Sequence, residues 1–386
     1  VSSIDRLQIA LVGTSFRQVG FEELGRLTLG PDQADARGLL RQALAGEELV
    51  YLSTCNRVEC YLAGRKLPKG EDLRQRAAGF FNLRGAPAAP DWFTVKSGAA
   101  AVEHLFAVTS SLDSLVAGET DIIRQVKRAA LAANEEELDG PGLKRLFERA
   151  VLCARRVHAE TGLGSKPVSV ATLAVQKIQR HFGPGGPPAS VLVGSGDMIH
   201  EVAGALSRYE GDRLFVNRSR AGAETLAAEF GGRASSLDEF CANPPAEIDL
   251  LFTATSAPEP VIPPHALEPA MEARHGRAPM IVCDLGVPRD VDPSLEGREG
   301  IILLALEHLE VIAELNRQKL ELELAQARDL VADHAARLSR EDRFRALANE
   351  STHAILVGRL GHLSEGDRET ILRFAKQLAE RFARQP

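Results

Sequence analysis

Short apolar runs alternate with stretches of helical periodicity at the start of the chain. Residues 7–13 form an apolar run that ends at a glycine, which predicts a buried strand followed by a turn. Residues 48–63 predict a strand, a turn and a second strand, and the segment 32–45 before them has the apolar spacing of a helix. Because strands and helices continue to mix to about residue 94, we expect an αβ domain here.

The pattern changes further along the chain. From residue 99 to residue 162 the apolar positions recur at helical spacing, so this stretch is expected to be helical. A loop rich in glycine and proline follows at 183–188. Beyond it, short apolar runs alternate with helical segments, and the runs are 190–193, 214–216, 250–252, 280–282 and 301–303. Strands that alternate with helices predict a parallel sheet with right-handed crossovers.

A helical segment without glycine or proline, residues 306–348, begins the last part of the chain. Its leucines and isoleucines are interleaved with charged residues, so one small domain cannot bury the whole helix. We expect a spinal helix, with further helices at 352–363 and 366–384 that form a dimerisation bundle. The expected fold is α/β and multidomain: an αβ N-terminal domain at 1–163, a Rossmann-type domain at 164–304, and the spinal helix with a helical dimerisation domain at 305–386.

Composition limits the classes of function. The net charge of −7 argues against wholesale binding of nucleic acid by a basic surface, although local basic clusters leave room for an RNA partner on one face. The five cysteines are scattered without paired spacing, which argues against a disulfide framework or a zinc site and fits a reducing cytoplasm. No apolar run reaches the roughly 18 residues of a membrane span, and the start lacks a signal-peptide pattern. We therefore expect a cytoplasmic protein without a membrane partner or a metal.

Cys55 is the first candidate for chemistry. An apolar run ends abruptly in a cluster with a thiol, an amide, a guanidinium and a carboxylate, Ser53-Thr54-Cys55-Asn56-Arg57-Val58-Glu59. A nucleophilic cysteine needs an electropositive setting, because a nearby cation lowers the pKa of the thiol. Arg57 is expected either to supply that charge or to grip an anionic substrate. For a lone cysteine, the alternative is a small buried filler beside a surface pair of Arg57 and Glu59.

The second candidate is a glycine turn. The short apolar run 190–193 leads directly into Gly194-Ser195-Gly196 and a helix, which is the front of a dinucleotide-binding fingerprint. The first glycine permits a tight turn, and the second lets the backbone approach a pyrophosphate. The helix N-terminus then offers its amide groups to that anion. Ile199 stands where the fingerprint has its third glycine.

The end of the next strand indicates which dinucleotide binds. An acidic residue there would indicate NAD, but the chain has Asn217-Arg218-Ser219-Arg220, whose cations suit a 2′-phosphate. We therefore expect NADP, and the alternative is a basic turn that binds no ligand. The segments 253–258 and 284–290 follow two further strands and are expected at the same ligand-binding edge of the sheet.

A nucleophilic cysteine upstream of an NADP module suggests one class of reaction. A thiolate attacks an activated carboxyl group, a thioester forms, and a hydride reduces the thioester to an aldehyde. The nucleophile belongs to the first domain and the hydride donor to the second. The two are therefore expected to face each other across a cleft.

Further motifs occur in a fixed order along both domains. They are the block 53–59, His104-Leu105-Phe106, the block 111–119 with Gln125-Val126-Lys127, Gly194-Ser195-Gly196, Asn217-Arg218-Ser219 and the block 284–293. In these motifs the chain resembles the glutamyl-tRNA reductase family, which begins tetrapyrrole synthesis from glutamate. The long helix after residue 305 is similar to the spinal helix and dimerisation domain of that family.

The resemblance implies a role for each matching residue. Cys55 would take glutamate from glutamyl-tRNA(Glu) as a thioester, and reduction with NADPH would give glutamate-1-semialdehyde, the first step of the C5 route to 5-aminolevulinate. Arg57 would pair with the substrate carboxylate in bidentate fashion, and His104 would transfer a proton or orient the substrate. The implied substrate-binding residues are Thr54, Asn56, Arg57, Ser114, Glu119, Thr120, Asp121 and Gln125. The implied NADPH-binding residues are Gly194, Ser195, Gly196, Asp197, Met198, Ile199, Asn217, Arg218 and Ser219.

Departures from the family pattern leave alternatives open. Phe16 replaces a usual histidine after the first strand, Thr120-Asp121 replaces a usual proline–glutamine pair, and Arg124 replaces a glycine. Asp121 brings a carboxylate near a pocket that should receive one. The alternatives are a non-catalytic paralogue that binds tRNA or a partner as a regulator, and another NADP-dependent dehydrogenase in which Cys55 is structural. The resemblance also implies a homodimer and, as a further partner, glutamate-1-semialdehyde aminomutase.

Overall fold

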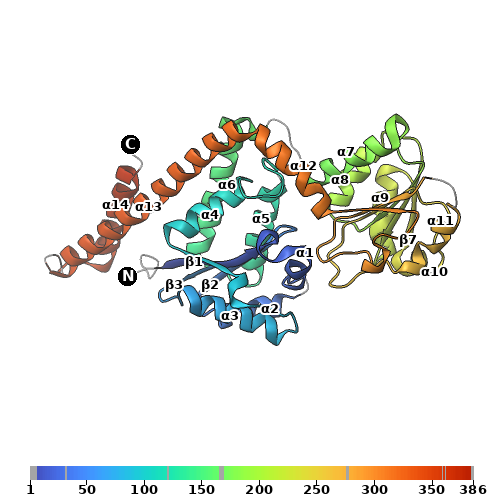
Figure 1. The fold of residues 1–386 in the computed structure, drawn as a ribbon. Coiled ribbons are helices and arrows are strands. Elements are labelled where there is room, and N and C mark those ends of the chain that lie inside the picture. The colour runs from blue at the N-terminus through green and yellow to red at the C-terminus, as the bar shows by residue number, and fades with distance from the viewer. Residues whose placement is uncertain are drawn as a thin grey trace.

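The computed structural model describes residues 7–30, 33–119, 121–164, 169–274, 278–358, 360 and 362–383. An antiparallel sheet, a parallel sheet and a group of long helices follow one another along the chain. Figure 1 shows them as parts of an elongated molecule, with the parallel sheet at one end and α14 at the other. Throughout the described ranges, every helix is too short or too polar to cross a membrane.

The first sheet has antiparallel strands in the order β2-β3-β1-β4. They are β1 (Gln8–Ser15), β2 (Glu48–Ser53), β3 (Arg57–Gly64) and β4 (Thr94–Ser97). Ser53 lies opposite Val58, so residues 54–56 make the whole connection between β2 and β3. The prediction of strand, turn and strand around Cys55 is confirmed.

Helices cover both faces of this sheet. In Figure 1, α2 and α3 lie below the strands and α4, α5 and α6 lie above them. The helices are α1 (Phe16–Arg26), α2 (Ala34–Ala43), α3 (Gly70–Leu83), α4 (Ala99–Thr109), α5 (Asp121–Glu135) and α6 (Pro141–Glu160). Every residue of the central strand β3 is buried, as expected for a strand that is covered on both faces. The helical interpretation of 99–162 is confirmed, with a loop between α4 and α5.

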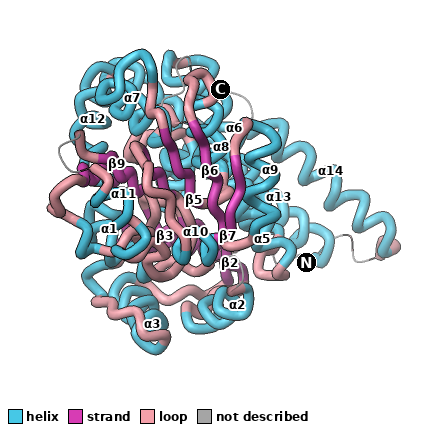
Figure 2. Tube along the Cα trace, turned by 90° about the vertical axis from the view of Figure 1, so that its right-hand side faces the viewer, coloured by secondary structure: helices cyan, strands magenta, loops and turns pink. Residues whose placement is uncertain are grey.

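The second sheet is parallel, with the order β10-β9-β8-β5-β6-β7. Its strands are β5 (Ala189–Val193), β6 (Asp212–Asn217), β7 (Arg233–Ser236), β8 (Leu250–Thr253), β9 (Met280–Asp284) and β10 (Ile301–Ala305). Figure 2 shows β5, β6 and β7 side by side. The strand order reverses between β5 and β8, which is the point where doubly wound sheets bind ligands. The predicted parallel sheet is confirmed, and β7 is an addition that its polar sequence did not signal.

The parallel sheet is apolar on both faces. Its helices are α7 (Val170–Phe182), α8 (Asp197–Leu206), α9 (Arg220–Phe230), α10 (Leu237–Ala242) and α11 (Glu268–Glu272). Leu192 belongs to the apolar cluster that includes residues of α7, α8 and α9, whereas its neighbours Val191 and Val193 belong to a separate cluster on the other face. Alternate residues of one strand thus anchor helices on opposite sides.

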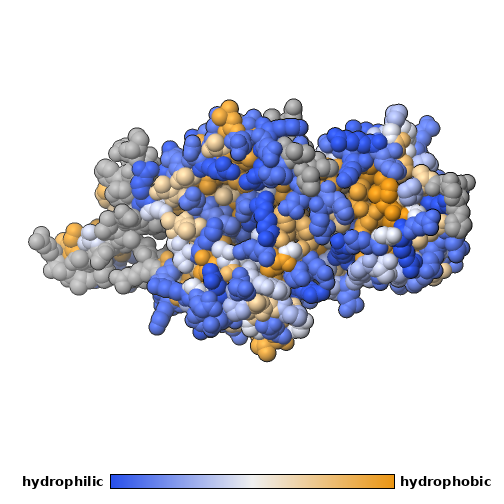
Figure 3. Space-filling model, in the orientation of Figure 1, coloured by the Kyte–Doolittle hydropathy of each residue, from blue (hydrophilic) through white to orange (hydrophobic). Residues whose placement is uncertain are grey.

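Figure 3 shows mostly hydrophilic side chains on the face in view, with apolar side chains gathered over the parallel-sheet part. A groove of about 460 Å³ lies between α7 and the edge strand β10. It is lined by Lys177, Arg180, His181, Ile281, Ile302 and Leu304. Cationic side chains beside an edge strand oppose its pairing with a strand of another chain.

The predicted spinal helix is interrupted. α12 (Leu306–Lys319) ends at Leu320 and α13 (Glu321–Gly358) begins directly after it, so the expectation of one continuous helix is wrong. The break contains no glycine or proline. α12 packs on α7 and β10, whereas α13 packs on α4 and α6, so the change of neighbours accounts for the break. α14 (Glu365–Ala383) runs along α13, and residues 352–358, expected in a separate helix, belong to α13.

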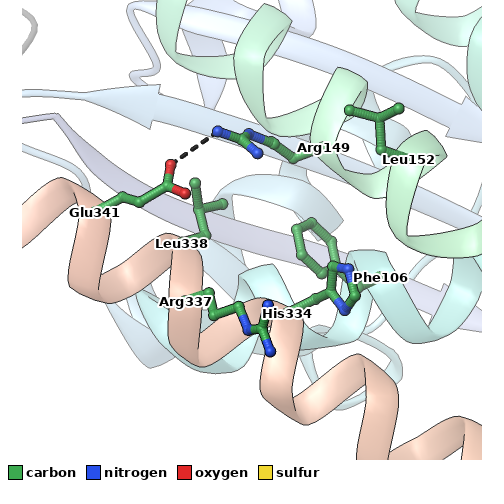
Figure 4. Close-up of a pocket in the computed structure, with 7 residues that line it drawn as sticks. All are labelled: Phe106, Arg149, Leu152, His334, Arg337, Leu338 and Glu341. Atoms are coloured by element: carbon green, nitrogen blue, oxygen red, sulfur yellow. Dashed lines mark hydrogen bonds and ion pairs between the residues drawn. The ribbon is translucent and has the colours of Figure 1, made fainter. Parts of the chain in front are cut away.

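Ion pairs and apolar contacts hold α13 against α6. Glu341 Oε2 accepts hydrogen bonds from Arg149 Nη2 at 2.8 Å and from Arg145 Nη2 at 3.2 Å. The Glu341 side chain is only 11% exposed, so its charge depends on these arginines. Beside the pair lies a cavity of about 250 Å³, which Figure 4 shows lined by Phe106, Arg149, Leu152, His334, Arg337, Leu338 and Glu341.

Replacing Glu341 by alanine removes this shared acceptor. We expect the free energy of unfolding to fall by about 1–3 kcal/mol, less than for a fully buried pair because both arginines remain partly exposed. Urea unfolding measures the change. Asp333→Ala is the matched control, because Asp333 pairs with Arg337 at 2.8 Å on the exposed side of the same helix. Equal losses in the two variants would contradict a docking role for Glu341.

Candidate active site

Hydrogen bonds fix the turn that carries Cys55. The Thr54 amide donates to the Arg57 carbonyl at 2.9 Å, and the Asn56 amide donates to the Thr54 hydroxyl at 3.1 Å. The Asn56 carbonyl accepts from the Phe16 amide at 3.1 Å, which ties the turn to the start of α1. Cys55 lies at the tip of this turn, half-buried and with a free thiol.

Asn56 offers an unused acceptor beside the thiol. Its side chain is buried, and within the described part of the chain its Oδ1 has no hydrogen-bond partner. A buried amide oxygen without a donor is costly, so a ligand that brings an N–H group would relieve the cost. Asn56 therefore supports the predicted substrate pocket at this turn.

Arg57 is already engaged by acidic residues. Its side chain is 3% exposed, Nη1 contacts Glu59 Oε1 at 2.7 Å, and Nη2 contacts Asp113 Oδ2 at 3.1 Å. Nη2 also donates to the Asp113 carbonyl. The guanidinium is therefore not free in this structure, because Glu59 and Asp113 already compensate its charge, and its contact with a substrate carboxylate stays a prediction. Only Asp113, whose side chain is 41% exposed, is placed to give way to an incoming anion.

The thiol does not have the electropositive setting that the sequence predicted. Burial raises the pKa of Cys55 to about 12, and the carboxylates of Glu119 and Asp121 raise it further than Arg57 lowers it. The effect of Arg57 is smaller than that of either carboxylate. In the absence of a ligand, Cys55 is a neutral thiol at pH 7.

Of the charged groups, Glu119 has the largest effect on the pKa of Cys55. Burial raises the pKa of Glu119 to about 8, and Asp121 and Glu201 add to the shift. Glu119 is therefore mostly protonated at pH 7 and becomes an anion as the pH rises above 8. Proton uptake and release at Glu119 thus change the field at Cys55.

The remaining residues predicted for the substrate pocket lie in the loop between α4 and α5 and at the start of α5. Ser114 is buried in the loop between α4 and α5. Asp121, the first residue of α5, is ion-paired with Arg124, and its Oδ2 accepts from Gln125 Nε2 at 3.1 Å. Its carboxylate is thus compensated within α5. Thr120 lies outside the described residues.

His104 belongs to a buried polar chain. Its Nε2 lies 2.7 Å from Glu59 Oε1, and its Nδ1 lies 3.0 Å from Lys96 Nζ. An ammonium group can only donate, so Nδ1 accepts and Nε2 carries the hydrogen that Glu59 receives. Both ring nitrogens of His104 therefore have polar partners. Lys96 was missed by the sequence interpretation, because it meets His104 only when the chain turns at Gly98 between β4 and α4.

The glycine turn fits a dinucleotide. Gly194 has a φ of +118°, and a Cβ there would lie 2.6 Å from the Ala254 carbonyl oxygen, so the turn demands glycine. α8 begins directly after Gly196, so its free amide groups point to the carboxyl edge of the sheet. Ile199 is fully buried, which explains why a third glycine is absent. Its side chain packs in the core, so of Ile199 only the backbone amide can take the predicted part in cofactor binding.

The end of β6 suits a 2′-phosphate through one arginine. Arg218 and Ser219 are exposed after Asn217. Arg220 is instead ion-paired with Glu224 at 3.2 Å and with Glu239 at 2.8 Å. Arg220 is thus engaged elsewhere, and the 2′-phosphate contact of Arg218 stays a prediction.

The two predicted rim segments bind each other. Thr253 Oγ1 donates to Asp284 Oδ1 at 3.0 Å, and the Thr255 amide donates to Asp290 Oδ2 at 2.7 Å. Burial, followed by the Asp284 charge, raises the pKa of Asp290 to about 7. These carboxylates hold the loops that follow β8 and β9. No cluster of acidic, histidine and cysteine side chains suited to a metal ion is found in the ranges that the structure describes.

Side chains of α5 and α8 join the two halves of the site. Arg128 Nη2 lies 2.8 Å from Asp197 Oδ2, and Arg124 Nη2 lies 3.3 Å from the same oxygen. Asp121 and Arg124 belong to the element that begins beside Cys55, and Asp197 begins the helix after the glycine turn. The start of α5, where the Asp121 charge raises the pKa of Cys55, is thus joined to the dinucleotide turn by ion pairs.

Known proteins are similar to this chain in sequence over most of its length. Residues 12–161 match the family described as glutamyl-tRNAGlu reductase, N-terminal domain, and residues 179–312 match shikimate/quinate 5-dehydrogenase. Glutamyl-tRNA reductase of Geobacillus thermodenitrificans is 32% identical, covering 98% of this chain and 86% of the relative. That of Deinococcus radiodurans is 35% identical, covering 86% and 93%. The solved glutamyl-tRNA reductase from Methanopyrus kandleri is 28% identical, covering 98% of this chain and 94% of that chain, with a TM-score of 0.46.

The substitution Glu119→Gln tests the coupling between Glu119 and Cys55. At pH 7 wild-type Glu119 is mostly protonated, so we expect similar rates of Cys55 alkylation by iodoacetamide in both proteins. Above pH 8 the wild-type anion raises the pKa of Cys55, and the variant should react faster, about tenfold for each unit of that shift. Peptide mass spectrometry separates Cys55 from the partly exposed Cys241. A constant ratio of rates between pH 7 and pH 10 would contradict the coupling.

Proposed function

The chain belongs to the glutamyl-tRNA reductase family, and we propose that it reduces glutamyl-tRNA(Glu) with NADPH to glutamate-1-semialdehyde by way of a thioester on Cys55. This reaction is the first step of tetrapyrrole synthesis by the C5 route. The observation that carries the proposal is the Cys55 turn, with the buried acceptor of Asn56, linked by α5 to the glycine turn before α8.

The substrate makes its first contacts at Asn56 and Arg57. The unpaired Oδ1 of Asn56 accepts a hydrogen bond from the α-ammonium of the glutamyl group. Arg57 exchanges the exposed carboxylate of Asp113 for the substrate carboxylate and keeps its buried pair with Glu59. Such an exchange preserves the compensation of the buried guanidinium. Ser114, Thr54 and Gln125 border this pocket.

Binding also prepares the thiol. A substrate ammonium near Cys55 opposes the carboxylates of Glu119 and Asp121, so the pKa of Cys55 falls when the pocket is filled. The sulfur then attacks the ester carbon, an S–C bond forms, and the C–O bond to the tRNA ribose breaks. The ribose oxygen leaves with the proton that the thiol released.

The second half-reaction takes place on the same sulfur. Residues 194–199 would hold the dinucleotide phosphates through backbone amides, and Arg218 would contact the 2′-phosphate. When bound, NADPH supplies the hydride that reduces the thioester to the aldehyde with release of the Cys55 thiolate. His104 acts as a positioning residue, because it holds Glu59, which in turn holds Arg57.

Cys55→Ser tests the covalent route. Without NADPH, the wild-type protein mixed with glutamyl-tRNA should accumulate a glutamyl thioester on the Cys55 peptide, detectable by mass spectrometry. The variant should form no thioester, and its aldehyde production should fall at least about a thousandfold, as for loss of a nucleophile. Cys241→Ser, a half-buried cysteine in the other sheet part, is the matched control. Aldehyde formation undiminished by Cys55→Ser would rule out the thioester, and a wild type without thioester or NADPH oxidation would favour the non-catalytic paralogue.

We further propose that the protein is a homodimer through α13 and α14. Ile355, Phe374 and Leu378 are 50%, 61% and 37% exposed, and large apolar side chains gathered on long helices are typical of an interface. A twofold axis would bury the same patch on both subunits.

Phe374→Glu should dissociate this dimer. A carboxylate buried at a twofold interface meets its own copy, so the dissociation constant should rise at least about a hundredfold. Sedimentation at micromolar concentration measures the oligomeric state. Leu83→Glu, at a leucine that is 91% exposed on α3, should leave it unchanged. A wild-type monomer, or equal effects of both substitutions, would refute the proposed interface.

Two proposals concern the surroundings of the enzyme. All five cysteines are free, which supports a reducing compartment such as the cytoplasm. The aldehyde product is reactive, so we propose direct transfer to glutamate-1-semialdehyde aminomutase, which co-sedimentation of the purified proteins would test.

A further inference from the structure

Two arginines of the first sheet part converge on the rim of the dinucleotide turn. Arg128 and Arg124 contact the same oxygen of Asp197, at 2.8 Å and 3.3 Å, from successive turns of α5. Their side chains are 65% and 51% exposed, and that of Asp197 is 40% exposed, so all three can move without disturbing a core. Arg124 also pairs with Asp121.

Asp197 lies where a dinucleotide places its charge. It is the first residue of α8, and the free amides of that helix turn are the ones that bind a diphosphate. The turn itself, Gly194-Ser195-Gly196-Asp197-Met198-Ile199, contains no lysine or arginine. A diphosphate bound there would therefore meet the Asp197 carboxylate without a cation from its own turn, and like charges at contact distance repel.

The cations that compensate this charge come from the other part of the protein. Resting on the proposed function, we infer that Arg124 and Arg128 are diphosphate ligands of NADPH: they leave Asp197 and bind the cofactor from the side of the thiol. A diphosphate offers a guanidinium more acceptor oxygens and more charge than one carboxylate does, so the exchange is favourable. The cofactor is then held between α8 and α5.

This assignment gives a purpose to the unusual residues of α5. Asp121 restrains Arg124 and Gln125, so it orients the cation rather than competing with the substrate. The same contact aligns the dinucleotide turn with the element that begins beside Cys55. Cofactor binding thereby becomes dependent on both parts of the chain.

The competing explanation is that the ion pairs only hold α5 to α8. It predicts a different sign for the change in NADPH affinity of one variant. If the ion pairs only hold α5 to α8, then Asp197→Asn and the double variant Arg124→Gln/Arg128→Gln break the same contact and shift NADPH affinity in the same direction. If the arginines are ligands, the double variant weakens binding, whereas Asp197→Asn removes a competitor and a repelling charge and tightens it.

The experiment is a titration of the full-length protein with NADPH, followed by nicotinamide fluorescence without substrate. We expect the double variant to bind NADPH about tenfold more weakly, with a shallower dependence on salt, and Asp197→Asn to bind severalfold more tightly. Arg76→Gln is the matched control, because Arg76 is a partly exposed helical arginine paired with Asp72 at 2.8 Å on α3. Adenosine 2′-monophosphate, a probe without the diphosphate, should compete equally well in all variants.

Each outcome decides the inference. Opposite shifts for the arginine and aspartate variants, with an unchanged affinity for adenosine 2′-monophosphate, support it. Shifts in the same direction, an unchanged NADPH affinity, or an equal loss for the diphosphate-free probe overturn it while leaving the proposed reductase intact. A wild-type protein that binds no NADPH refutes the proposed function as well.

Discussion

The buried carboxylate of Glu59 organises the catalytic half of this protein. One of its oxygens contacts both Arg57 Nη1 and His104 Nε2, at 2.7 Å each, and the other accepts from the Tyr61 hydroxyl at 2.6 Å. Burial opposes its charge, but Arg57 and His104 hold the pKa of Glu59 far below its usual range. A charge in the interior must keep such partners, because removing one leaves the other uncompensated. Glu59 therefore fixes Arg57 and His104, two of the predicted site residues.

The fixed pair constrains the chemistry at the neighbouring turn. Arg57 is paired with Glu59 and Asp113, and it lowers the pKa of Cys55 less than Glu119 and Asp121 raise it. The free protein keeps a neutral thiol, which also protects it from reaction with other electrophiles. Activation by the bound substrate would restrict thiolate formation to the moment when an ester lies beside it. The exposed member of the charge network, Asp113, is the part that can change partners.

The two sheets contribute different kinds of control. The antiparallel sheet holds the thiol on a three-residue connection between paired strands, where little movement is possible. The parallel sheet presents the glycine turn at the point where its strand order reverses, and α8 begins there. The contacts between them are half-exposed ion pairs of α5 and α8, whose strength depends on solvent and on competing anions. A charged cofactor that competes for these ion pairs would change how strongly α5 is held to α8.

Much of the architecture could be predicted from the sequence, because apolar periodicity and glycine turns act locally. The strand–turn–strand around Cys55, the helical segment after residue 99, the parallel sheet and the dinucleotide turn all follow from such local patterns. The edge strand β7 and the break at Leu320 do not, since neither has a local signal and both depend on which elements pack beside them.

The same limit applies to the site. The sequence identified Cys55, Arg57 and His104 as candidate chemical groups. Only the tertiary structure decided that Glu59 holds Arg57 and His104 and that Lys96 contacts the histidine. It also decided that carboxylates raise the pKa of the thiol more than the arginine lowers it. Charges act through space at distances of a few ångströms, and Arg128 and Asp197, which share such a distance, are 69 positions apart along the chain.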